Sequence, residues 1–211
     1  WSSDVFSFRS IRTDDGDVRV VAAEGDAITA TIEGRTGRTV RDGVRLSVNG
    51  RDGKAVIDAS REMKRKLVSI NPGEYELLVE LPERLYEQVE IVAVAADISV
   101  ADVRAEQISL RAIHGEIDTA GLAGNIEART DAGDIELGVR AFEGIIRAET
   151  LVGDIEVVAA EAPEKLALDM RTSIGERKVG LPGTAIVDAG PDVPEVRLRA
   201  DVGDLEVSVE R

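Results

Sequence analysis

The sequence of 211 residues has no cysteine, one histidine and only six aromatic residues. The lack of cysteine excludes disulfide bonds, thiolate metal sites and a cysteine nucleophile. The single histidine, His114, is too little for a zinc site or a histidine-based catalytic triad. We expect it to be a solvated turn residue beside Gly115. No apolar run approaches about 18 residues, so this segment does not read as a membrane-spanning helix.

Aromatic residues make up 3% of the chain while hydrophobic residues make up 43%, so the core has to consist of Val, Ile, Leu and Ala. Such short and branched side chains suit closely stacked β-strands. Positive charge is also scarce, with 26 Lys and Arg against 41 Asp and Glu and a net charge of −15. This balance excludes a nucleic-acid-binding surface. It leaves a cationic protein or peptide, an envelope component, weak Ca²⁺ binding or solubility alone as explanations.

One short phrase recurs: a glycine, a polar residue that is most often acidic, an Ile or Val, and another polar residue. It is written Gly115-Glu116-Ile117-Asp118, Gly124-Asn125-Ile126-Glu127, Gly133-Asp134-Ile135-Glu136 and Gly153-Asp154-Ile155-Glu156. The alternation of polar and apolar residues is that of a strand with one buried face. A step of about nine residues between glycines therefore predicts one short strand and one turn per unit.

Alternate units resemble each other more than neighbouring units do. Thr130, Thr150 and Thr172 each stand three residues before a glycine, whereas Gly124 and Gly144 lack that threonine. Coils that stack place like residues above like residues, which favours parallel winding over a chain of hairpins. The pattern predicts coils of 18–22 residues. It also predicts an interior ladder, formed by Ile98, Ile117, Ile135 and Ile155.

The fold class predicted is therefore all-β, a parallel β-solenoid of the single-stranded β-helix type with about two short strands per coil. Residues 1–95 contain short turn signals and predict an antiparallel β region or cap that is continuous with the solenoid. Residues 96–180 form the coils, and residues 181–211 supply C-terminal closing strands. A closing element is expected because an open solenoid exposes strand edges.

If alternate units stack, one sheet carries outward carboxylates at nearly every position. The candidate acidic binding face consists of Glu116, Asp118, Asp134, Glu136, Asp154, Glu156 and Glu176. The other sheet has one carboxylate at the matching positions Gln107, Ser109, Asn125, Glu127, Ile145, Arg147, Lys165 and Ala167. At a coil spacing of about 4.8 Å, two unit charges repel by about 0.9 kcal/mol in water. The face either collects a cationic ligand or only maintains solubility.

The run from Tyr75 to Pro82, followed by Ile98, Ile108 and the repeated Thr-x-x-Gly-Asp-Ile-Glu, resembles the bacterial putative adhesin family. This family is a domain of unknown function with a β-solenoid fold and includes the LiaG-like proteins of envelope-stress operons. The resemblance covers residues 75–210 well and the first 75 loosely. It implies an extracytoplasmic protein that is cell-surface or membrane-anchored through a segment upstream of Trp1. Arg177 stands where the family has Ile, so the solenoid is expected to fray there.

The family offers no catalytic, metal or cofactor residues to carry over. We therefore expect a non-catalytic binding or scaffold protein of the bacterial cell envelope, linked to envelope stress. The alternative is a polysaccharide lyase or hydrolase built on a β-helix, because paired carboxylates can hydrolyse glycosidic bonds. Against it, few aromatic rings are available to hold sugars. A regular ladder also places no two acids in different environments, as acid–base catalysis requires.

Overall fold

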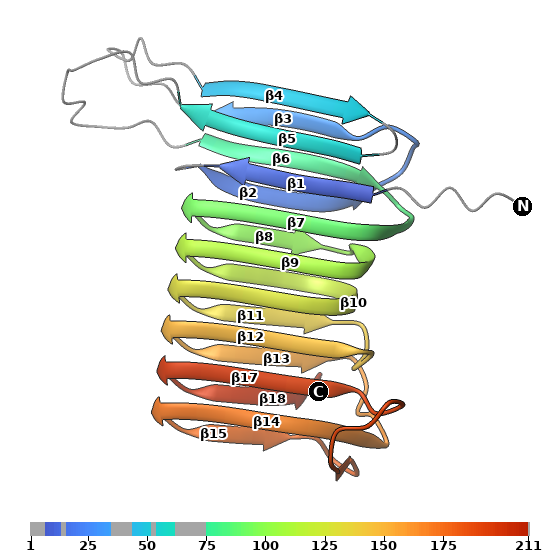
Figure 1. Cartoon of the computed structure of the whole chain (residues 1–211), viewed down its shortest axis with the longest axis vertical. Coiled ribbons are helices and arrows are strands. Elements are labelled where there is room, and N and C mark those ends of the chain that lie inside the picture. Colours follow the sequence, from blue (N-terminus) through green and yellow to red (C-terminus); the bar gives the residue numbers. More distant parts are fainter. Residues whose placement is uncertain (1–6, 14–15, 35–43, 52–53, 62–74, 211) are drawn as a thin grey trace, which may run out of the picture.

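The computed structural model describes residues 7–13, 16–34, 44–51, 54–61 and 75–210, and these residues form an all-β stack. Eighteen strands and no helix occur in the described ranges, so there is no helix that could cross a membrane in this part of the chain. The strands lie in two layers, one behind the other, and the chain winds from one layer to the other and back (Figure 1). The predicted β-solenoid is confirmed.

The two layers are named sheet A and sheet B, and β10 (Ile117–Ala132) begins in sheet B and continues in sheet A. In spatial order sheet A contains β4 (Val44–Arg51), β5 (Lys54–Arg61), β1 (Ser7–Thr13), β7 (Leu85–Ala95), β9 (Arg104–His114), β10, β12 (Ile145–Val152), β17 (Glu195–Val202) and β14 (Lys165–Ile174). Sheet B contains β3 (Thr29–Gly34), β6 (Tyr75–Pro82), β2 (Asp17–Ala23), β8 (Ile98–Ala101), β10, β11 (Ile135–Val139), β13 (Ile155–Ala159), β18 (Leu205–Val209) and β15 (Arg177–Gly180). The short strand β16 (Ala185–Ile186) pairs with the start of β14.

The core is a set of aliphatic ladders between the two sheets. Ile98, Ile117, Ile135 and Ile155 pair in register on adjacent parallel strands, and none of them is more than 1% exposed. The predicted interior ladder is therefore confirmed. It is longer than expected, because Val18 precedes it and Leu205 follows it in the stack. Short branched side chains fill the narrow space between the sheets without large rings.

Among the described strands, antiparallel pairing is confined to two places in the N-terminal region. β3 pairs with β6 and β4 pairs with β5 in antiparallel fashion. By contrast, β1, β2, β6 and β7 join the parallel stack. The parallel coils thus begin well before residue 96. The turn residues in the sequence were enough to identify the hairpin of β4 and β5. They could not identify the parallel pairings of β1 and β2, because these depend on how buried side chains of different coils pack together.

The first and the last described coils of the chain are inserted into the stack rather than added to its ends. The N-terminal coil of β1 and β2 lies between the coil of β5 and β6 and that of β7 and β8. The C-terminal coil of β17 and β18 lies between β12 and β13 on one side and β14 and β15 on the other (Figure 1). Both terminal coils are therefore hydrogen-bonded on both edges, where a free terminus would fray. The strands of residues 181–211 do not simply close the end of the solenoid.

The coil of β14 and β15 ends the stack. β15 pairs with β18 over all four of its residues, so the expected fraying at Arg177 is wrong. Arg177 occupies the ladder position opposite Leu205, and its Nη1 donates to the carbonyl oxygen of Met170 at 3.3 Å. A charge at a core position on an edge strand disfavours pairing with a further strand. Arg177 therefore ends the apolar ladder where the stack ends.

We expect Ile135→Asp to lower the free energy of unfolding by several kcal/mol, about 3–5, because the carboxylate would enter a dry core without a partner. Ile135→Val, which removes one methylene group from the same fully buried position, should cost only about 0.5–1.5 kcal/mol. Chemical denaturation followed by far-UV circular dichroism measures both. Equal and small effects of the two substitutions would contradict the interior ladder.

We expect Arg177→Leu to increase self-association, because it continues the apolar ladder to an open strand edge. Lys178→Leu is the matched control, since it also replaces a cation by leucine but at the neighbouring position, on the outward column with Glu206. Sedimentation velocity over a concentration series should show dimers or larger species for Arg177→Leu alone. Identical sedimentation of the two variants would show that Arg177 does not protect the edge.

Candidate functional site: the acidic face

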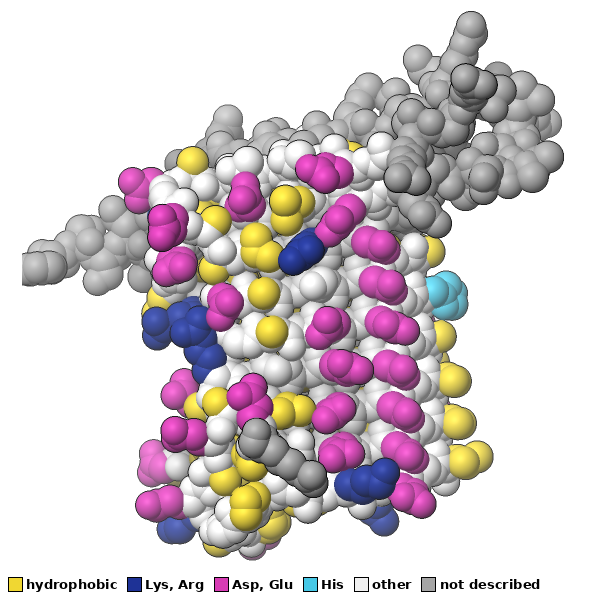
Figure 2. Space-filling view, turned by 180° about the vertical axis from the view of Figure 1, so that it is seen from behind, with side chains coloured by type: hydrophobic (Ala, Val, Ile, Leu, Met, Phe, Trp, Pro, Cys, Tyr) yellow, Lys and Arg dark blue, Asp and Glu magenta, His cyan; other side chains and the backbone are white. Residues whose placement is uncertain are grey.

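The outward surface of sheet B carries two parallel columns of carboxylates, which we call the acidic face (Figure 2). The turn column, which precedes each strand of the sheet, consists of Asp17, Asp97, Glu116, Asp134, Asp154, Asp204 and Glu176. The strand column, two residues further on, consists of Arg19, Ser99, Asp118, Glu136, Glu156, Glu206 and Lys178. Eleven of these fourteen residues are acidic and two are basic. The parallel register brings like residues together, so the charges accumulate.

The aspartates of the turn column tie adjacent coils together. The Oδ1 atom of Asp134 accepts a hydrogen bond from the backbone N–H of Asp154 at 2.8 Å, and Asp154 accepts one from Asp204 at 2.7 Å. The same bond runs from Asp97 to Asp17 at 3.2 Å, from Glu116 to Asp97 at 2.9 Å and from Glu176 to Asp204 at 2.7 Å, in each case from backbone N–H to Oδ1. These charge-assisted bonds hold one oxygen of each aspartate and leave the other toward solvent. The acid after the repeated glycine therefore has a structural role.

The glycine and threonine of the repeat complete the same turn. Gly153 has φ = 146°, and a Cβ atom at this position would lie 2.0 Å from the carbonyl oxygen of Gly133 in the next coil. Only glycine allows this left-handed conformation together with so close an approach. Thr150 donates its hydroxyl to the same Gly133 carbonyl at 3.2 Å, and Thr130 bonds Gly115 in the same way at 3.1 Å. The Thr-x-x-Gly-Asp phrase is thus a coil-to-coil joint.

The strand column differs from the turn column because its side chains are not used in such bonds. The side chains of Asp118, Glu136 and Glu156 are exposed, and their carboxylates have no hydrogen-bond partner among the described residues. Glu136 pairs across the sheet with Asp118 on one side and Glu156 on the other, at the coil spacing of about 4.8 Å. Such like-charged neighbours destabilise the stack unless a cation lies against them. The strand column is thus the part of the face that packing does not explain.

No group of three or more His, Asp and Glu side chains converges on a possible metal position within the described part of the chain. The reason is geometric: side chains of one column on parallel strands point in the same direction instead of toward a common centre. A calcium ion needs six to eight oxygen ligands around it. The acidic face is thus suited to an extended cationic ligand, spread along the columns, more than to a chelated ion.

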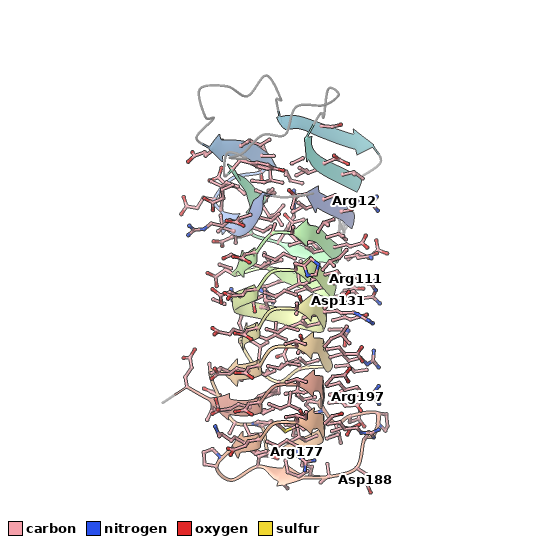
Figure 3. All side chains as sticks on the ribbon, turned by 90° about the vertical axis from the view of Figure 1, so that its left-hand side faces the viewer. Arg12, Arg111, Asp131, Arg177, Asp188 and Arg197 are labelled. Atoms are coloured by element: carbon pink, nitrogen blue, oxygen red, sulfur yellow. The ribbon has the colours of Figure 1, made fainter. Side chains whose placement is uncertain are left out.

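Sheet A carries charges of both signs, which pair with each other. Arg111 lies 3.4 Å from Glu127, and Glu149 lies 3.7 Å from Arg129 and 3.9 Å from Arg199. The matching outward columns of this sheet hold Glu90, Ser109, Glu127, Arg147, Arg197, Asp169, Val92, Arg111, Arg129, Glu149, Arg199 and Arg171. Six of these residues are arginines and four are acids; Figure 3 labels Arg111 and Arg197 among them. Of the outward columns of the two sheets, only those of sheet B therefore carry a large excess of negative charge.

The seven predicted site residues all lie on one face, and their binding role stays a prediction. Glu176 is not stacked on Asp154 as predicted, since Asp204 lies between them. The face also includes four acids outside the predicted seven, which are Asp17, Asp97, Asp204 and Glu206. The phrase Gly203-Asp204-Leu205-Glu206 repeats the motif and was the available signal. Its distance from Asp154 in the sequence concealed that these two coils are adjacent.

On sheet A the predicted alignment of the last unit is wrong by two residues. Gln107, Asn125 and Ile145 share a column as predicted. Ala167 occupies the place that Lys165 was predicted to have, because β14 pairs with β17 and places Ala167 opposite Glu195. Lys165 pairs with Ala185 of β16 instead. His114 is exposed in the strand end beside Gly115, as expected for a residue at a turn.

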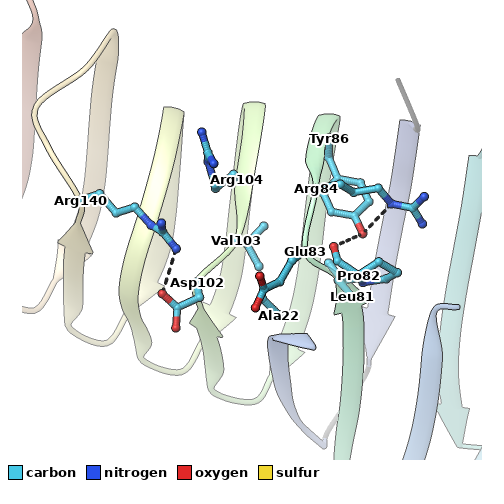
Figure 4. A pocket seen from close by; sticks show the side chains of 10 residues that line it. All are labelled: Ala22, Leu81, Pro82, Glu83, Arg84, Tyr86, Asp102, Val103, Arg104 and Arg140. Carbon is cyan, nitrogen blue, oxygen red and sulfur yellow. Dashed lines mark hydrogen bonds and ion pairs between the residues drawn. The ribbon is translucent and has the colours of Figure 1, made fainter. Parts of the chain in front are cut away.

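A cavity of about 400 Å³ lies where chain segments pass from sheet B to sheet A near the N-terminal coils (Figure 4). Its lining includes Arg84, Tyr86, Asp102, Arg104 and Arg140. The Arg140 guanidinium lies 3.1 Å from Asp102, and the Tyr86 hydroxyl donates to the Pro82 carbonyl at 2.9 Å. Burial raises the pKa of Tyr86, so this donor stays protonated over the physiological range. Sequence reasoning missed this cavity because stacking assembles it from distant segments.

The two roles of the columns predict different effects of truncation. Asp154→Ala removes the acceptor of the Asp204 N–H and should lower the free energy of unfolding by about 1–2 kcal/mol. Asp154→Asn keeps an acceptor oxygen and relieves repulsion, so it should stay within about 0.5 kcal/mol of the wild type or exceed it. Glu156→Ala, in the strand column of the same coil, is the control and should be neutral or slightly stabilising. Denaturant titrations measure the free energy of unfolding of the three variants. An equal loss of stability in both alanine variants would contradict the structural role of the Asp154 hydrogen bond between coils.

The model of the Toastrack DUF4097 family matches residues 9–125 and residues 86–208, so together the two matches cover nearly the whole chain. Their overlap at residues 86–125 is expected of a repetitive stack. The match confirms the family resemblance seen in the Thr-x-x-Gly-Asp phrase. No curated protein matches the sequence.

Two solved structures have a similar fold over nearly the whole chain. A putative adhesin from Bacteroides fragilis is 14% identical with a TM-score of 0.51, covering 96% of this chain and 93% of that chain. A putative cell adhesion protein from Clostridium sporogenes is 14% identical with a TM-score of 0.46, covering 97% and 94%.

Proposed function

Because the chain belongs to the Toastrack DUF4097 family, we propose that it is a non-catalytic binding or scaffold module of the bacterial cell envelope. In this proposal it acts outside the cytoplasm, is tied to envelope stress, and holds a cationic partner on the acidic face. The observation that carries the proposal is the segregation of charge between the two sheets. Sheet A pairs its charges, whereas sheet B leaves eleven carboxylates in two columns beside only two cations.

The location outside the cytoplasm is supported by the fold neighbour of Bacteroides fragilis, whose name is putative adhesin. The module presents a long and regular surface, and such stacked repeats serve as extended binding surfaces. A partner on the surface of the cell or in its envelope would meet this surface directly. The complete lack of cysteine is compatible with that location, since no thiol has to be kept reduced.

The cationic partner is supported by the strand column. The carboxylates of Asp118, Glu136 and Glu156 repel one another in the free protein and have no hydrogen bond or ion pair among the described residues. A cationic chain laid along the column would relieve this repulsion, and its favourable energy would weaken with salt. Ca²⁺ acts on the same face only weakly in this proposal, because the carboxylates do not converge on one point.

The non-catalytic character is supported by the environment of the acids. Acid–base chemistry on a sugar needs two carboxyl groups whose surroundings push their pKa values apart. The acids of each column have nearly the same surroundings from coil to coil. In the cavity of Figure 4, Asp102 is bonded to Arg140 and its side chain is 66% exposed. These features do not favour the lyase or hydrolase alternative.

A lysine octapeptide tests the proposal. It should bind the purified protein and raise its melting temperature in a saturable way, because a ligand of the folded state stabilises that state. The same ionic strength of NaCl should raise the melting temperature less and without saturation. Fluorescence anisotropy and differential scanning fluorimetry measure the two effects.

The matched variants neutralise equal charge on the two sheets. Asp118→Asn/Glu136→Gln/Glu156→Gln on sheet B should weaken binding at least tenfold, which is about 1.4 kcal/mol. Glu90→Gln/Glu127→Gln/Asp169→Asn on sheet A should leave the affinity within about twofold, since a loss of long-range attraction alone is screened over about 10 Å. An equal loss of affinity in both variants would mean that peptide binding depends only on the net charge of the protein. The proposed binding site on sheet B would then be wrong.

A further inference from the structure

Exposed apolar side chains gather along one edge of the stack, and we call this line the apolar ridge. It consists of Val94, Ile113, Leu151, Val152, Val202 and Ile174, which are between 40% and 67% exposed. These are six of the nine large hydrophobic residues that are exposed in the described part of the chain. Soluble proteins seldom align exposed apolar groups in this way unless a partner covers them. The ridge takes no part in the aliphatic core between the sheets.

The apolar ridge runs directly beside the turn column of the acidic face. Each ridge residue precedes an acid of that column by two or three residues, as in Val152-Gly153-Asp154 and Ile174-Gly175-Glu176. Val152, Val202 and Ile174 pair in register on three consecutive strands, so they stand above one another. Figure 2 shows the apolar edge next to the two acidic columns. A single ligand can therefore touch both.

The charges on the two sides of the ridge are not equivalent. On the side of sheet A, Arg111, Arg129 and Arg199 are engaged by Glu127 or Glu149. On the side of sheet B the carboxylates are not balanced by cations. Asp201 adds an acid at a ridge position, next to Val202, whereas Asp131, next to Ala132, lies 4.0 Å from Arg129. The charge complement of the whole surface is therefore a ligand with one apolar side and one basic side.

We propose that the apolar ridge and the turn column together bind a basic amphipathic α-helix of a partner protein, with its apolar side on the ridge. This deepens the proposed function and rests on it. The repeat distances agree, because coils follow one another at about 4.8 Å and helical turns at about 5.4 Å. The ridge residues come from five of six successive coils, since the coil of β10 and β11 places Asp131 and Ala132 there. The six coils span about 24 Å, which corresponds to about 16 helical residues. A helix with apolar residues at every third or fourth position matches this row.

Other occupants fit the charge less well. A second copy of this chain carries the same net charge of −15, so two ridges would bring two acidic faces together. An anionic lipid surface would be repelled by the turn column for the same reason. A helix with lysines or arginines beside its apolar side satisfies both parts of the surface.

Three designed peptides of about 16 residues test the inference. The first places leucine on one side of a helix and lysine on the other. The second has the same composition with leucine distributed around the helix, and the third carries the same number of lysines among alanines and no leucine. We expect the first peptide to bind at least tenfold more tightly than the second, as measured by fluorescence anisotropy at one fixed salt concentration. Circular dichroism should show that it becomes helical when bound.

The ridge variant Leu151→Thr/Val152→Thr/Ile174→Thr/Val202→Thr keeps β-branched or similarly sized residues on exposed strand positions. It should reduce the preference for the first peptide to less than about twofold while its affinity for the third is unchanged, because the acidic face is intact. The control variant Leu85→Thr/Val179→Thr/Ile186→Thr removes exposed apolar residues elsewhere and should retain the preference. Melting curves ensure that all variants are folded.

The possible results separate the inference from the proposed function. Equal binding of the first two peptides, or an unchanged preference in the ridge variant, would overturn the helix site while the acidic face remains a binding surface. If the third peptide, made of lysine and alanine, also fails to bind, the proposed function is wrong as well. If the wild type sediments as a dimer that the ridge variant abolishes, or binds anionic vesicles through the ridge, the ridge serves another occupant and the inference is wrong.

Discussion

The joint between successive coils at the Thr-x-x-Gly-Asp turn determines most of this structure. Glycine allows the backbone to approach the neighbouring coil, and threonine donates a hydrogen bond to the glycine carbonyl of that coil. The aspartate side chain accepts a hydrogen bond from the backbone N–H of the corresponding acid in an adjacent coil. Each bond is worth only about 1 kcal/mol, yet repetition fixes the register of every coil against its neighbours. Once the register is fixed, every position of the repeat becomes a column that runs along the stack.

The columns explain both the stability and the charge of the molecule. An apolar column facing inward gives the ladder through Ile117, Ile135 and Ile155. The same geometry forces acidic positions to line up outside, where like charges lie about 4.8 Å apart. In the turn column this repulsion is offset by hydrogen bonds to backbone N–H groups. In the strand column no such bond offsets it, so its acids lack the structural role that the acids of the turn column have.

The insertion of both terminal coils adds a second constraint to the stack. A solenoid built in chain order would leave its first and last coils as open edges, and these would invite pairing with other chains. Here the coils of β1–β2 and β17–β18 are internal, and Arg177 terminates the core ladder at the end coil. In the apolar ridge, Val202 consequently stands between Val152 and Ile174, although its coil is distant from that of Val152 in the sequence.

The sequence by itself determined the local unit: a strand of alternating polar and apolar residues, a glycine turn, and two strands per coil. It also placed Ile98, Ile117, Ile135 and Ile155 in one ladder and seven acids on one face, because the period of the repeat sets which side chains share a side. The order of the coils was decided only in the tertiary structure. Val18 and Leu205 are apolar residues that would fit at any position of the interior ladder. The local sequence pattern therefore cannot predict between which coils their strands are inserted.

The cavity around Tyr86, the ridge from Val94 to Ile174 and the neighbourhood of Asp204 and Glu176 all follow from that order. They depend on packing between segments as far apart as residues 154 and 204, whose approach is driven by burial of the common core and leaves no local signal in the chain.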